Sequence, residues 1–269
     1  MCTIGLVRLA EDDYVLFKNK DFVRSRFEDR LVVESEIFGA MGTTSWAGTD
    51  VQSDRFSGLS IGANAHGLLC CDANVQTLED HENYDELVEI ALRKGTDVGS
   101  AIEAVRSAVE LKPYLWANLL MIDTNESASI EVRSNRVEVV PLVGPTARAN
   151  HHVKLGANSQ DDDTVTSQSR HESAQRQIES VATMEDLFDL LSSHDDGDTG
   201  VCNHSLYQTV YSYVLRHRNG TTSLYVSQGH PCESPTPKKL TLPIGKMWTI
   251  ANEAEFRAAY PSTASLQLR

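Results

Sequence analysis

Residues 1–22 read MCTIGLVRLAEDDYVLFKNKDF, a stretch that places a cysteine directly behind the initiator Met1. Two hydrophobic runs, 4–9 and 14–17, flank a polar segment at 11–13. Short apolar runs rich in β-branched and aromatic residues on either side of a polar turn are typical of a β-hairpin. The stretch therefore predicts a strand, a turn and a second strand that returns beside Cys2.

The position of Cys2 makes it a candidate N-terminal nucleophile. If Met1 is removed, as the small Cys2 side chain would allow, one residue carries both a thiol and a free α-amine. The amine has an ordinary pKa of roughly 7.7–8.0 and the thiol one of about 8.5, so the amine can take the thiol proton near neutrality. Chance is the alternative: 5 of the 269 residues are Cys, so an arbitrary position holds Cys with a probability of roughly one in fifty.

Length and composition favour one soluble globular domain over residues 1–269. The chain is 41% hydrophobic and 23% charged, which is ordinary for a folded domain of this size. No apolar run approaches the roughly 18 residues of a membrane helix. Acidic residues at 11–13 also argue against a secretory signal. We therefore expect a cytoplasmic protein.

The acidic balance restricts the partners. The net charge is −14, from 38 acidic and 24 basic residues, which disfavours nucleic acid or an anionic membrane as a partner. A small-molecule substrate is expected instead, and a homo-oligomer is compatible with the sequence. Only 8 of the 24 basic residues are Lys, a balance that would suit a salt-rich, halophilic cytoplasm; an ordinary acidic mesophilic enzyme is the alternative.

Periodicity predicts an α+β architecture. Segments 39–48 and 57–62 are polar and rich in glycine, so they are expected to be loops. The remaining pattern is of antiparallel strands and paired helices in separate groups, which favours two stacked sheets covered by helices on both outer faces. The expected strands after the hairpin are 31–37, 68–75, 115–122, 127–132, 136–142, 206–215 and 222–227, and the expected helices are 84–94, 97–112, 170–181 and 184–191.

Several short motifs follow one another in an order that resembles a known superfamily. They are Met1-Cys2-Thr3, Phe17-Lys18-Asn19-Lys20-Asp21, Gly67 to Asn74, Ala149-Asn150-His151, Ser167 to Arg170 and Gly229-His230-Pro231-Cys232. In this order the chain is similar to the N-terminal-nucleophile (Ntn) hydrolases of the choloylglycine hydrolase and acyl-CoA:6-aminopenicillanic acid acyltransferase branch. The resemblance implies a four-layer αββα sandwich of two antiparallel sheets flanked by helices, and it implies no cofactor.

The resemblance also implies roles at the nucleophile. Cys2 would attack the carbonyl of an amide, and its own α-amine would shuttle the proton. Asp21 matches the acidic residue whose carboxylate holds that amine; a turn-terminating Asp is the alternative. Lys18 stands where the bile-salt enzymes usually carry Arg, so a cation could favour the thiolate without the planar guanidinium. A solvated hairpin lysine is the alternative for Lys18.

Three further residues match polar positions of the family. Asn74 and Asn150 match amides whose N–H groups, with backbone donors, would stabilise the tetrahedral oxyanion, and Asn150 is the stronger match. Asn74 could instead end a strand. Arg170 matches an Arg that supports the nucleophile and its carboxylate network; a helix Arg paired with a nearby acid is the alternative.

Metal binding is not predicted. The adjacent histidines His151 and His152 point to opposite faces of an extended segment and make a poor chelate. Cys202 and His204 could share a strand face as a separate Cys-His site, but the sequence beside them offers no second pair. The acidic runs 160–163 and 194–198 are expected to be solvated loops.

The sequence thus predicts a cysteine amidohydrolase that cleaves a linear, non-peptide carbon–nitrogen amide through an acyl-enzyme on Cys2. Three alternatives stay open. Transfer of the acyl group to an amine or CoA would use the same intermediate. A glutamine amidotransferase also begins Met-Cys, but its glutamine-binding signatures are not seen here. A non-enzymatic, trafficking-related group carries Asn-Arg-Asp-Glu near the end of its second strand, where this chain has Asn19-Lys20-Asp21-Phe22.

Overall fold

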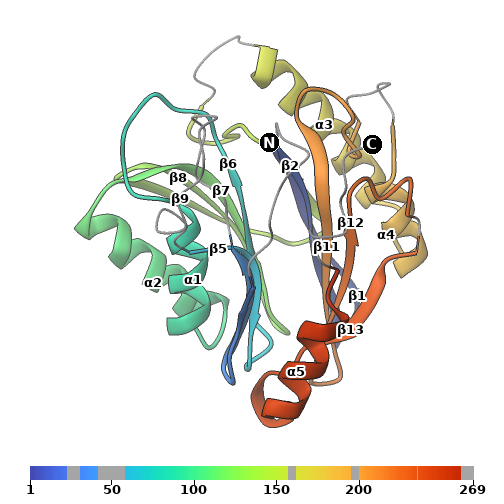
Figure 1. Cartoon of the computed structure of the whole chain (residues 1–269). Helices are drawn as coiled ribbons and strands as arrows, with labels where there is room; N and C mark the ends of the chain where they lie inside the picture. Colours follow the sequence, from blue (N-terminus) through green and yellow to red (C-terminus); the bar gives the residue numbers. More distant parts are fainter. Residues whose placement is uncertain (23–30, 42–57, 157–161, 195–199, 235, 262–269) are drawn as a thin grey trace.

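The computed structural model describes residues 1–22, 31–41, 58–156, 162–194, 200–234 and 236–261, and two antiparallel sheets stand side by side in it (Figure 1). The six-stranded sheet has the order β10-β1-β2-β11-β12-β13, and the seven-stranded sheet has the order β3-β4-β5-β6-β7-β8-β9. The strands of the first sheet are β1 (Cys2–Ala10), β2 (Asp13–Phe22), β10 (Thr146–Arg148), β11 (Gln208–Arg218), β12 (Thr221–Gln228) and β13 (Lys238–Thr241). Those of the second are β3 (Leu31–Val33), β4 (Ile37–Met41), β5 (Leu59–Asn64), β6 (Leu69–Asn74), β7 (Tyr114–Ile122), β8 (Ser127–Ser134) and β9 (Arg136–Pro141).

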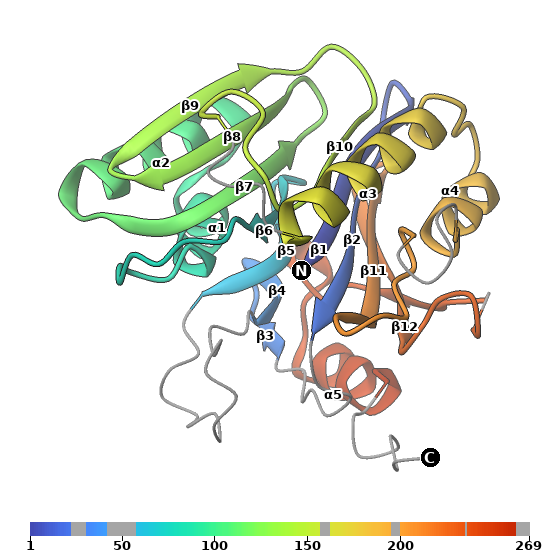
Figure 2. The same ribbon diagram turned by 90° about the horizontal axis from the view of Figure 1, so that it is seen from above.

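Helices cover the outer face of each sheet (Figures 1 and 2). The seven-stranded sheet carries α1 (Asp85–Lys94) and α2 (Val98–Leu111), whereas the six-stranded sheet carries α3 (Asp162–Ile178) and α4 (Met184–Leu191). Three apolar cores result, one between the sheets and one under each helical layer. The expected αββα sandwich is therefore confirmed.

The β1–β2 hairpin lies at the centre of its sheet and is buried on both faces. Alternate side chains of a strand point to opposite faces, and here Leu16 enters the core between the sheets while Val15 and Phe17 enter the core beneath α3 and α4. Continuous burial requires apolar residues on both faces, which is why the hydrophobic run in β1 does not alternate with polar residues. On β1, Cys2 and Ile4 belong to the core between the sheets.

Local signals explain where several helices begin and end. Asp97 accepts a hydrogen bond from the Ser100 backbone, and the Ser100 side chain returns one to the Asp97 backbone, so this capping box starts α2. Thr183 and Asp186 form the same arrangement at the start of α4. The predicted helices at 84–94, 97–112 and 184–191 agree closely with α1, α2 and α4.

Other expectations need correction. The single strand expected at 31–37 is a hairpin of β3 and β4, because the polar segment 34–36 between them makes a turn. Residues 39–41 and 59–62, expected as loops, lie in β4 and β5. The helix expected at 170–181 is α3, which begins earlier, at Asp162. Residues 162 and 163 of the expected acidic loop at 160–163 also lie in α3. Residues 42–57, 160–161 and 195–198 lie outside the described residues.

The short strands β10 and β13 and the helix α5 (Ile250–Ala259) were not predicted. α5 begins after Thr249, whose hydroxyl accepts a hydrogen bond from the Asn252 backbone. Its Phe256 packs edge to face against Phe38 in the core between the sheets, with ring centroids 5.4 Å apart. In Figure 1, α5 therefore closes the lower end of the sandwich, and the N-terminus lies at the upper end. Within the described ranges, no helix combines the length and apolarity that a membrane span requires.

Candidate active site

Cys2 lies at the first position of β1, where the N-terminus enters the space between the two sheets (Figure 2). Only 8% of its surface is exposed, and its side chain belongs to the core between the sheets. The Cys2 backbone N–H donates to Oδ1 of Asn150 at 2.9 Å. A side chain 148 positions away thus holds the nitrogen that would become the α-amine after loss of Met1.

Met1 extends β1 by one residue and covers this nitrogen. Its α-amine donates to the Asp21 carbonyl at 2.9 Å, and the Asp21 backbone N–H donates to the Met1 carbonyl at 2.8 Å. Burial lowers the pKa of the Met1 α-amine, while the nearby Cys2 and Asp21 oppose that shift. An amine buried in this corner of the sandwich therefore loses its proton more readily than one in water.

The side-chain amide of Asn150 has all its polar groups engaged. Its Oδ1 accepts from the Cys2 backbone and from the Arg170 guanidinium, the latter at 2.9 Å. Its Nδ2 donates to the backbone carbonyl of Asn74 at 2.7 Å and to the Asn74 side-chain Oδ1 at 2.9 Å. Donors on one side and acceptors on the other fix which end of the amide is oxygen.

Arg170 approaches from α3 and binds the backbone of the nucleophile. One of its terminal nitrogens donates to the Cys2 carbonyl at 2.9 Å and to the Thr3 hydroxyl at 3.0 Å, and the other reaches Asn150. Arg170 is 1% exposed and lies among the largest fully buried side chains of the described chain. The planar guanidinium thus bridges β1 and the Asn150 segment, which a single ammonium could not do.

Asp21 is buried beside this network. Its Oδ1 accepts a hydrogen bond from the Thr209 hydroxyl at 2.8 Å. Burial raises the pKa of the Asp21 carboxyl, and the charges of Arg170 and the N-terminal amine pull it back down. Its ionisation therefore depends on the cations packed around it.

The Lys18 side chain points away from Asp21, into the space between the sheets and towards the seven-stranded sheet. Its ammonium donates to the Asp72 carboxylate at 2.8 Å, to the Asp72 carbonyl at 2.7 Å and to the Ser60 carbonyl at 3.2 Å. These contacts occupy its three N–H groups. Burial lowers the pKa of Lys18, but the Asp72 carboxylate overcomes this, and the net shift is upward. Lys18 can thus act on the Cys2 thiol only through its charge.

The structure brings Cys2, Asp21, Asn74, Asn150 and Arg170 together at one end of the sandwich, and Lys18 lies near enough to Cys2 for its charge to act on it. Asn150 forms hydrogen bonds with Cys2, Asn74 and Arg170, and the Asp21 backbone carbonyl accepts one from the Met1 α-amine. Lys18 lies on the inner face of β2, the side on which Cys2 also lies, whereas Asp21 lies on the opposite face, as strand alternation requires.

Sequence reasoning did not assign roles to several supporting side chains. Ser167 accepts a hydrogen bond from the Asn150 backbone at 2.7 Å, and its hydroxyl also lies 2.8 Å from Nδ1 of His151. Asn118 donates to the carbonyls of Ala149 and His151, on either side of Asn150. Ser167 stood within a quoted motif, whereas Asn118 gave no local signal in the sequence.

Comparisons with known proteins give independent findings. The family model described as acyl-coenzyme A:6-aminopenicillanic acid acyl-transferase matches residues 8–231. The C2A mutant of conjugated bile acid hydrolase from Clostridium perfringens has a TM-score of 0.53 at 13% identity, over 90% of this chain and 92% of that chain. The N-acylethanolamine-hydrolyzing acid amidase ortholog from Caenorhabditis elegans has a TM-score of 0.54 at 12% identity, over 80% of this chain and 92% of that chain. No curated protein sequence matches the chain significantly.

Proposed function

Because the chain belongs to the acyl-coenzyme A:6-aminopenicillanic acid acyl-transferase family, we propose that it cleaves a linear, non-peptide amide through an acyl-enzyme on Cys2. Its fold is that of the Ntn hydrolases, and its class is that of their amide hydrolases and acyltransferases. The observation that carries the proposal is the hydrogen bond from the Cys2 backbone nitrogen to Asn150. This contact would hold the mature α-amine beside the thiol of the same residue.

The proposed reaction begins with removal of Met1, which turns the Cys2 backbone nitrogen into a free amine. The amine takes the thiol proton, and the sulfur attacks the substrate carbonyl carbon to form a carbon–sulfur bond. When the tetrahedral intermediate collapses, the carbon–nitrogen bond breaks and the α-amine passes its proton to the leaving amine. The α-amine then takes a proton from water as the water oxygen attacks the thioester carbon. The carbon–sulfur bond breaks, the carboxylic acid is released, and the amine returns the proton to the thiolate.

We assign the side-chain contribution to the oxyanion site to Asn74 rather than to Asn150. Both N–H groups of the Asn150 amide already donate to Asn74. Asn74 accepts these bonds through its oxygens, and its own Nδ2 donates to no residue that the structure describes. Asn74 is 6% exposed at the end of β6. A preorganised amide donor of this kind stabilises the developing negative charge without reorganising.

Asp21 and Arg170 would position the nucleophile. The Asp21 carboxylate lies near the N-terminal amine, whose charge affects its ionisation, so it can orient and stabilise the protonated amine during the reaction. Arg170 fixes the Cys2 carbonyl and Asn150 at once. Holding reacting groups in one geometry supplies much of the advantage of an enzyme over a reaction in solution.

The substrate class rests on the relatives. One similar structure is named as a hydrolase of conjugated bile acids and the other as a hydrolase of N-acylethanolamines, which favours a linear amide that is not a peptide. The family description names an acyl-coenzyme A acyl-transferase, so transfer of the acyl group to an amine or CoA is the second candidate function. The cytoplasmic and halophilic assignments stay predictions.

Intact mass spectrometry of the purified protein with a panel of N-acyl amides tests the proposal. We expect a chain that lacks Met1 and carries an acyl adduct on Cys2, whose mass identifies the acyl group. Cys2→Ala should abolish turnover and the adduct, Cys2→Ser should retain weak activity at most, and Cys70→Ala, in a core strand away from the site, should keep both. Full activity in Cys2→Ala, or a mature chain that retains Met1, would reject the mechanism.

Product partition separates hydrolysis from transfer. The acyl-enzyme is common to both reactions, so the ratio of carboxylic acid to new amide or thioester depends on what attacks the thioester. Adding hydroxylamine or CoA at increasing concentration should leave the carboxylic acid as the main product if the enzyme is a hydrolase. A product that shifts almost wholly to the acceptor at low concentration would assign it as a transferase.

A further inference from the structure

Three segments of the chain meet at a cluster of cysteine and histidine side chains outside the proposed catalytic network. His194 follows the C-terminal end of α4, Cys202 and His204 lie in the segment before β11, and Cys232 lies in the turn after β12. One ligand atom from each of these four residues lies within 4.8 Å of every other. The sequence shows no second cysteine–histidine pair beside Cys202 and His204. The fold supplies one, because it brings His194 and Cys232 to them from other segments.

The distances at His204 suit a shared metal ion. Its Nε2 lies 3.6 Å from Sγ of Cys202 and 3.2 Å from Sγ of Cys232. With zinc–sulfur bonds of about 2.3 Å and zinc–nitrogen bonds of about 2.0–2.1 Å, a tetrahedral ion separates neighbouring sulfur and nitrogen ligands by about 3.6 Å. The two sulfurs therefore flank one imidazole nitrogen at nearly the spacing of a tetrahedral site.

We propose that His194, Cys202, His204 and Cys232 bind one divalent ion of the zinc type. Two thiolates and two imidazoles in a tetrahedral arrangement are the ligand set that selects zinc over the hard cations magnesium and calcium. With four protein ligands the site is closed, so the ion stabilises structure and does not activate water. The proposal is independent of the chemistry assigned to Cys2.

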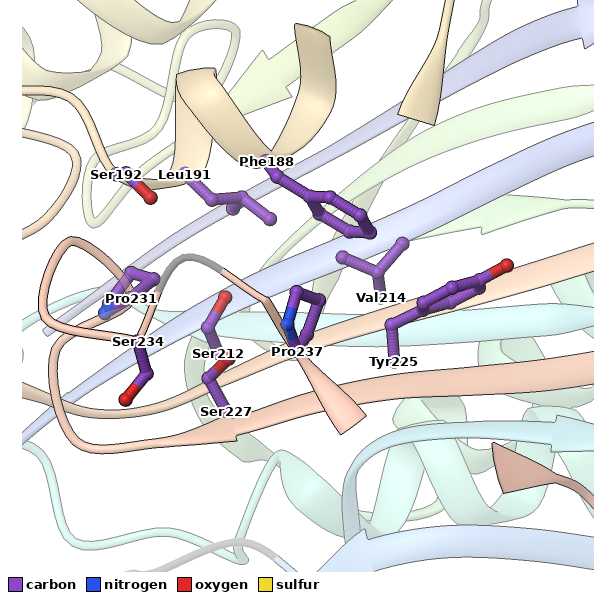
Figure 3. A pocket seen from close by; sticks show the side chains of 10 residues that line it. All are labelled: Phe188, Leu191, Ser192, Ser212, Val214, Tyr225, Ser227, Pro231, Ser234 and Pro237. Atoms are coloured by element: carbon purple, nitrogen blue, oxygen red, sulfur yellow. The ribbon is translucent and has the colours of Figure 1, made fainter. Parts of the chain in front are cut away.

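The protein backbone places these segments together by contacts that need no metal. The Cys202 backbone N–H donates to the Ser193 carbonyl at 3.0 Å, which joins the ligand loop to the end of α4. Figure 3 shows a hollow on the outer face of the six-stranded sheet, where Pro231 and Ser234 of the β12 turn lie across from Leu191 and Ser192. Cys232 therefore comes from a turn already packed near α4. A preorganised site loses less conformational entropy when it binds its ion.

The ligand loop also leads to the carboxylate of the catalytic proposal. Asn203, between the two ligands Cys202 and His204, donates its backbone N–H to the Thr209 hydroxyl at 2.9 Å. The Thr209 hydroxyl in turn donates to Asp21 at 2.8 Å. The ion would thus fix the loop that holds the hydrogen-bond partner of Asp21.

Metal binding at this site must release protons. Coordination requires both cysteines as thiolates, so any proton on either sulfur passes to solvent as its metal–sulfur bond forms. Apparent affinity should therefore fall steeply as the pH is lowered.

Cobalt titration of the full chain tests the site, because tetrahedral cobalt with thiolate ligands absorbs in the visible and gives a sulfur-to-metal charge-transfer band. The Cys2→Ala background keeps the active-site thiol from binding the probe, so the result does not depend on turnover. We expect the bands to saturate at about one equivalent of cobalt, and zinc to displace them. Zinc should also raise the melting temperature, by mass action.

Matched variants locate the ligands. Cys232→Ala and His204→Asn should lose the charge-transfer band, and His194→Asn should weaken binding. Cys70→Ala and His66→Asn replace a cysteine and an exposed histidine elsewhere and should bind as the parent does. Bands that survive Cys232→Ala or His204→Asn, or a reduced protein that binds no cobalt, would overturn the proposal. So would a native Cys202–Cys232 disulfide, seen by mass spectrometry as a chain two hydrogens lighter.

Discussion

At the scale of single residues, the hydrogen-bond capacity of Asn150 decides how the proposed site divides its work. A side-chain amide has two N–H donors and one acceptor oxygen. In Asn150 both N–H groups donate to Asn74, and the oxygen accepts hydrogen bonds from the Cys2 backbone N–H and from the Arg170 guanidinium. The stronger sequence match for an oxyanion donor, Asn150, is thus the residue whose donors are already in use. We therefore propose that Asn150 orients the nucleophile and Asn74.

Arg170 offers a test that separates charge from geometry. Arg170→Lys keeps a cation but loses the fork that bridges Cys2 and Asn150, so we expect kcat to fall on the order of a hundredfold. Arg170→Leu also removes a charge that lowers the pKa of Asp21, so that pKa rises and the acid limb of the kcat/KM profile moves to higher pH. Steady-state rates from pH 4 to 9 measure both effects.

The matched control for Arg170 is Arg176→Lys, near the C-terminal end of the same helix. It should leave kcat and the pH profile unchanged. If Arg170→Lys turned over at the parental rate, the bridging role would be wrong. An acid limb that did not move in Arg170→Leu would show that Asp21 does not govern that limb.

Single residues also show why only part of the site could be predicted from sequence. The candidacy of Cys2 followed from its position, and those of Asp21, Asn150 and Arg170 followed from ordered motifs. The partner of Lys18 is Asp72, 54 positions away on the other sheet, and no local pattern links the two. The cluster around His204 depends in the same way on Cys232, 28 positions away.

At the scale of elements, the hydrophobic period and the capping residues predicted the long segments. The glycines of β4 and β5, in contrast, led to a wrong prediction of loops. Gly39 and Gly62 lie opposite each other in the pairing of these strands. A Cβ atom on Gly62 would lie 2.4 Å from the Phe38 carbonyl and 2.7 Å from the Leu92 side chain of α1. Glycine serves close packing here rather than a turn, which the sequence alone could not distinguish.

This packing predicts that Gly62→Ala is destabilising. The new methyl group would collide with backbone that cannot move independently, so we expect a loss of about 2–3 kcal/mol in the free energy of unfolding. Gly99→Ala is the matched control. Gly99 lies in the first turn of α2, and the nearest atom to a Cβ there is Oδ1 of Asp97 at 3.5 Å. This substitution should stabilise by up to about 1 kcal/mol. Urea unfolding measures both, and equal stabilities would refute the packing argument.

At the scale of the whole molecule, the proposed site and helix α5 lie at opposite ends of the sandwich (Figure 1). The core between the sheets runs from Cys2 to Phe256, so the buried nucleophile stands at the end of one continuous apolar layer. The layers themselves could be predicted, because alternating groups of strands and helices allow few arrangements. Helix α5 could not, since its single buried residue, Phe256, gives almost no periodic signal.

Protonation of the half-buried His171 should couple the stability of the whole molecule to pH. Burial, aided by the nearby His151 and Arg148, lowers the pKa of His171 to about 4, against about 6.5 in the unfolded chain. Between these values the unfolded state binds more protons, so the free energy of unfolding must fall as the pH drops from 6.5 to 4. The full shift corresponds to about 3 kcal/mol, which solvent screening of a partly exposed ring reduces to roughly 1–2 kcal/mol.

Urea unfolding at pH 7 and pH 4.5 measures this linkage. His171→Gln removes the titrating ring, so its free energy of unfolding should fall less over this range than that of the parent, by roughly 1–2 kcal/mol. His66→Gln, which alters an exposed histidine in a turn, should keep the parental slope. The charge of His151 also acts on His171, with ring centroids 5.2 Å apart. His151→Gln should therefore also make the fall in stability between pH 7 and pH 4.5 smaller than in the parent, and an unchanged slope in His171→Gln would exclude His171 as the source.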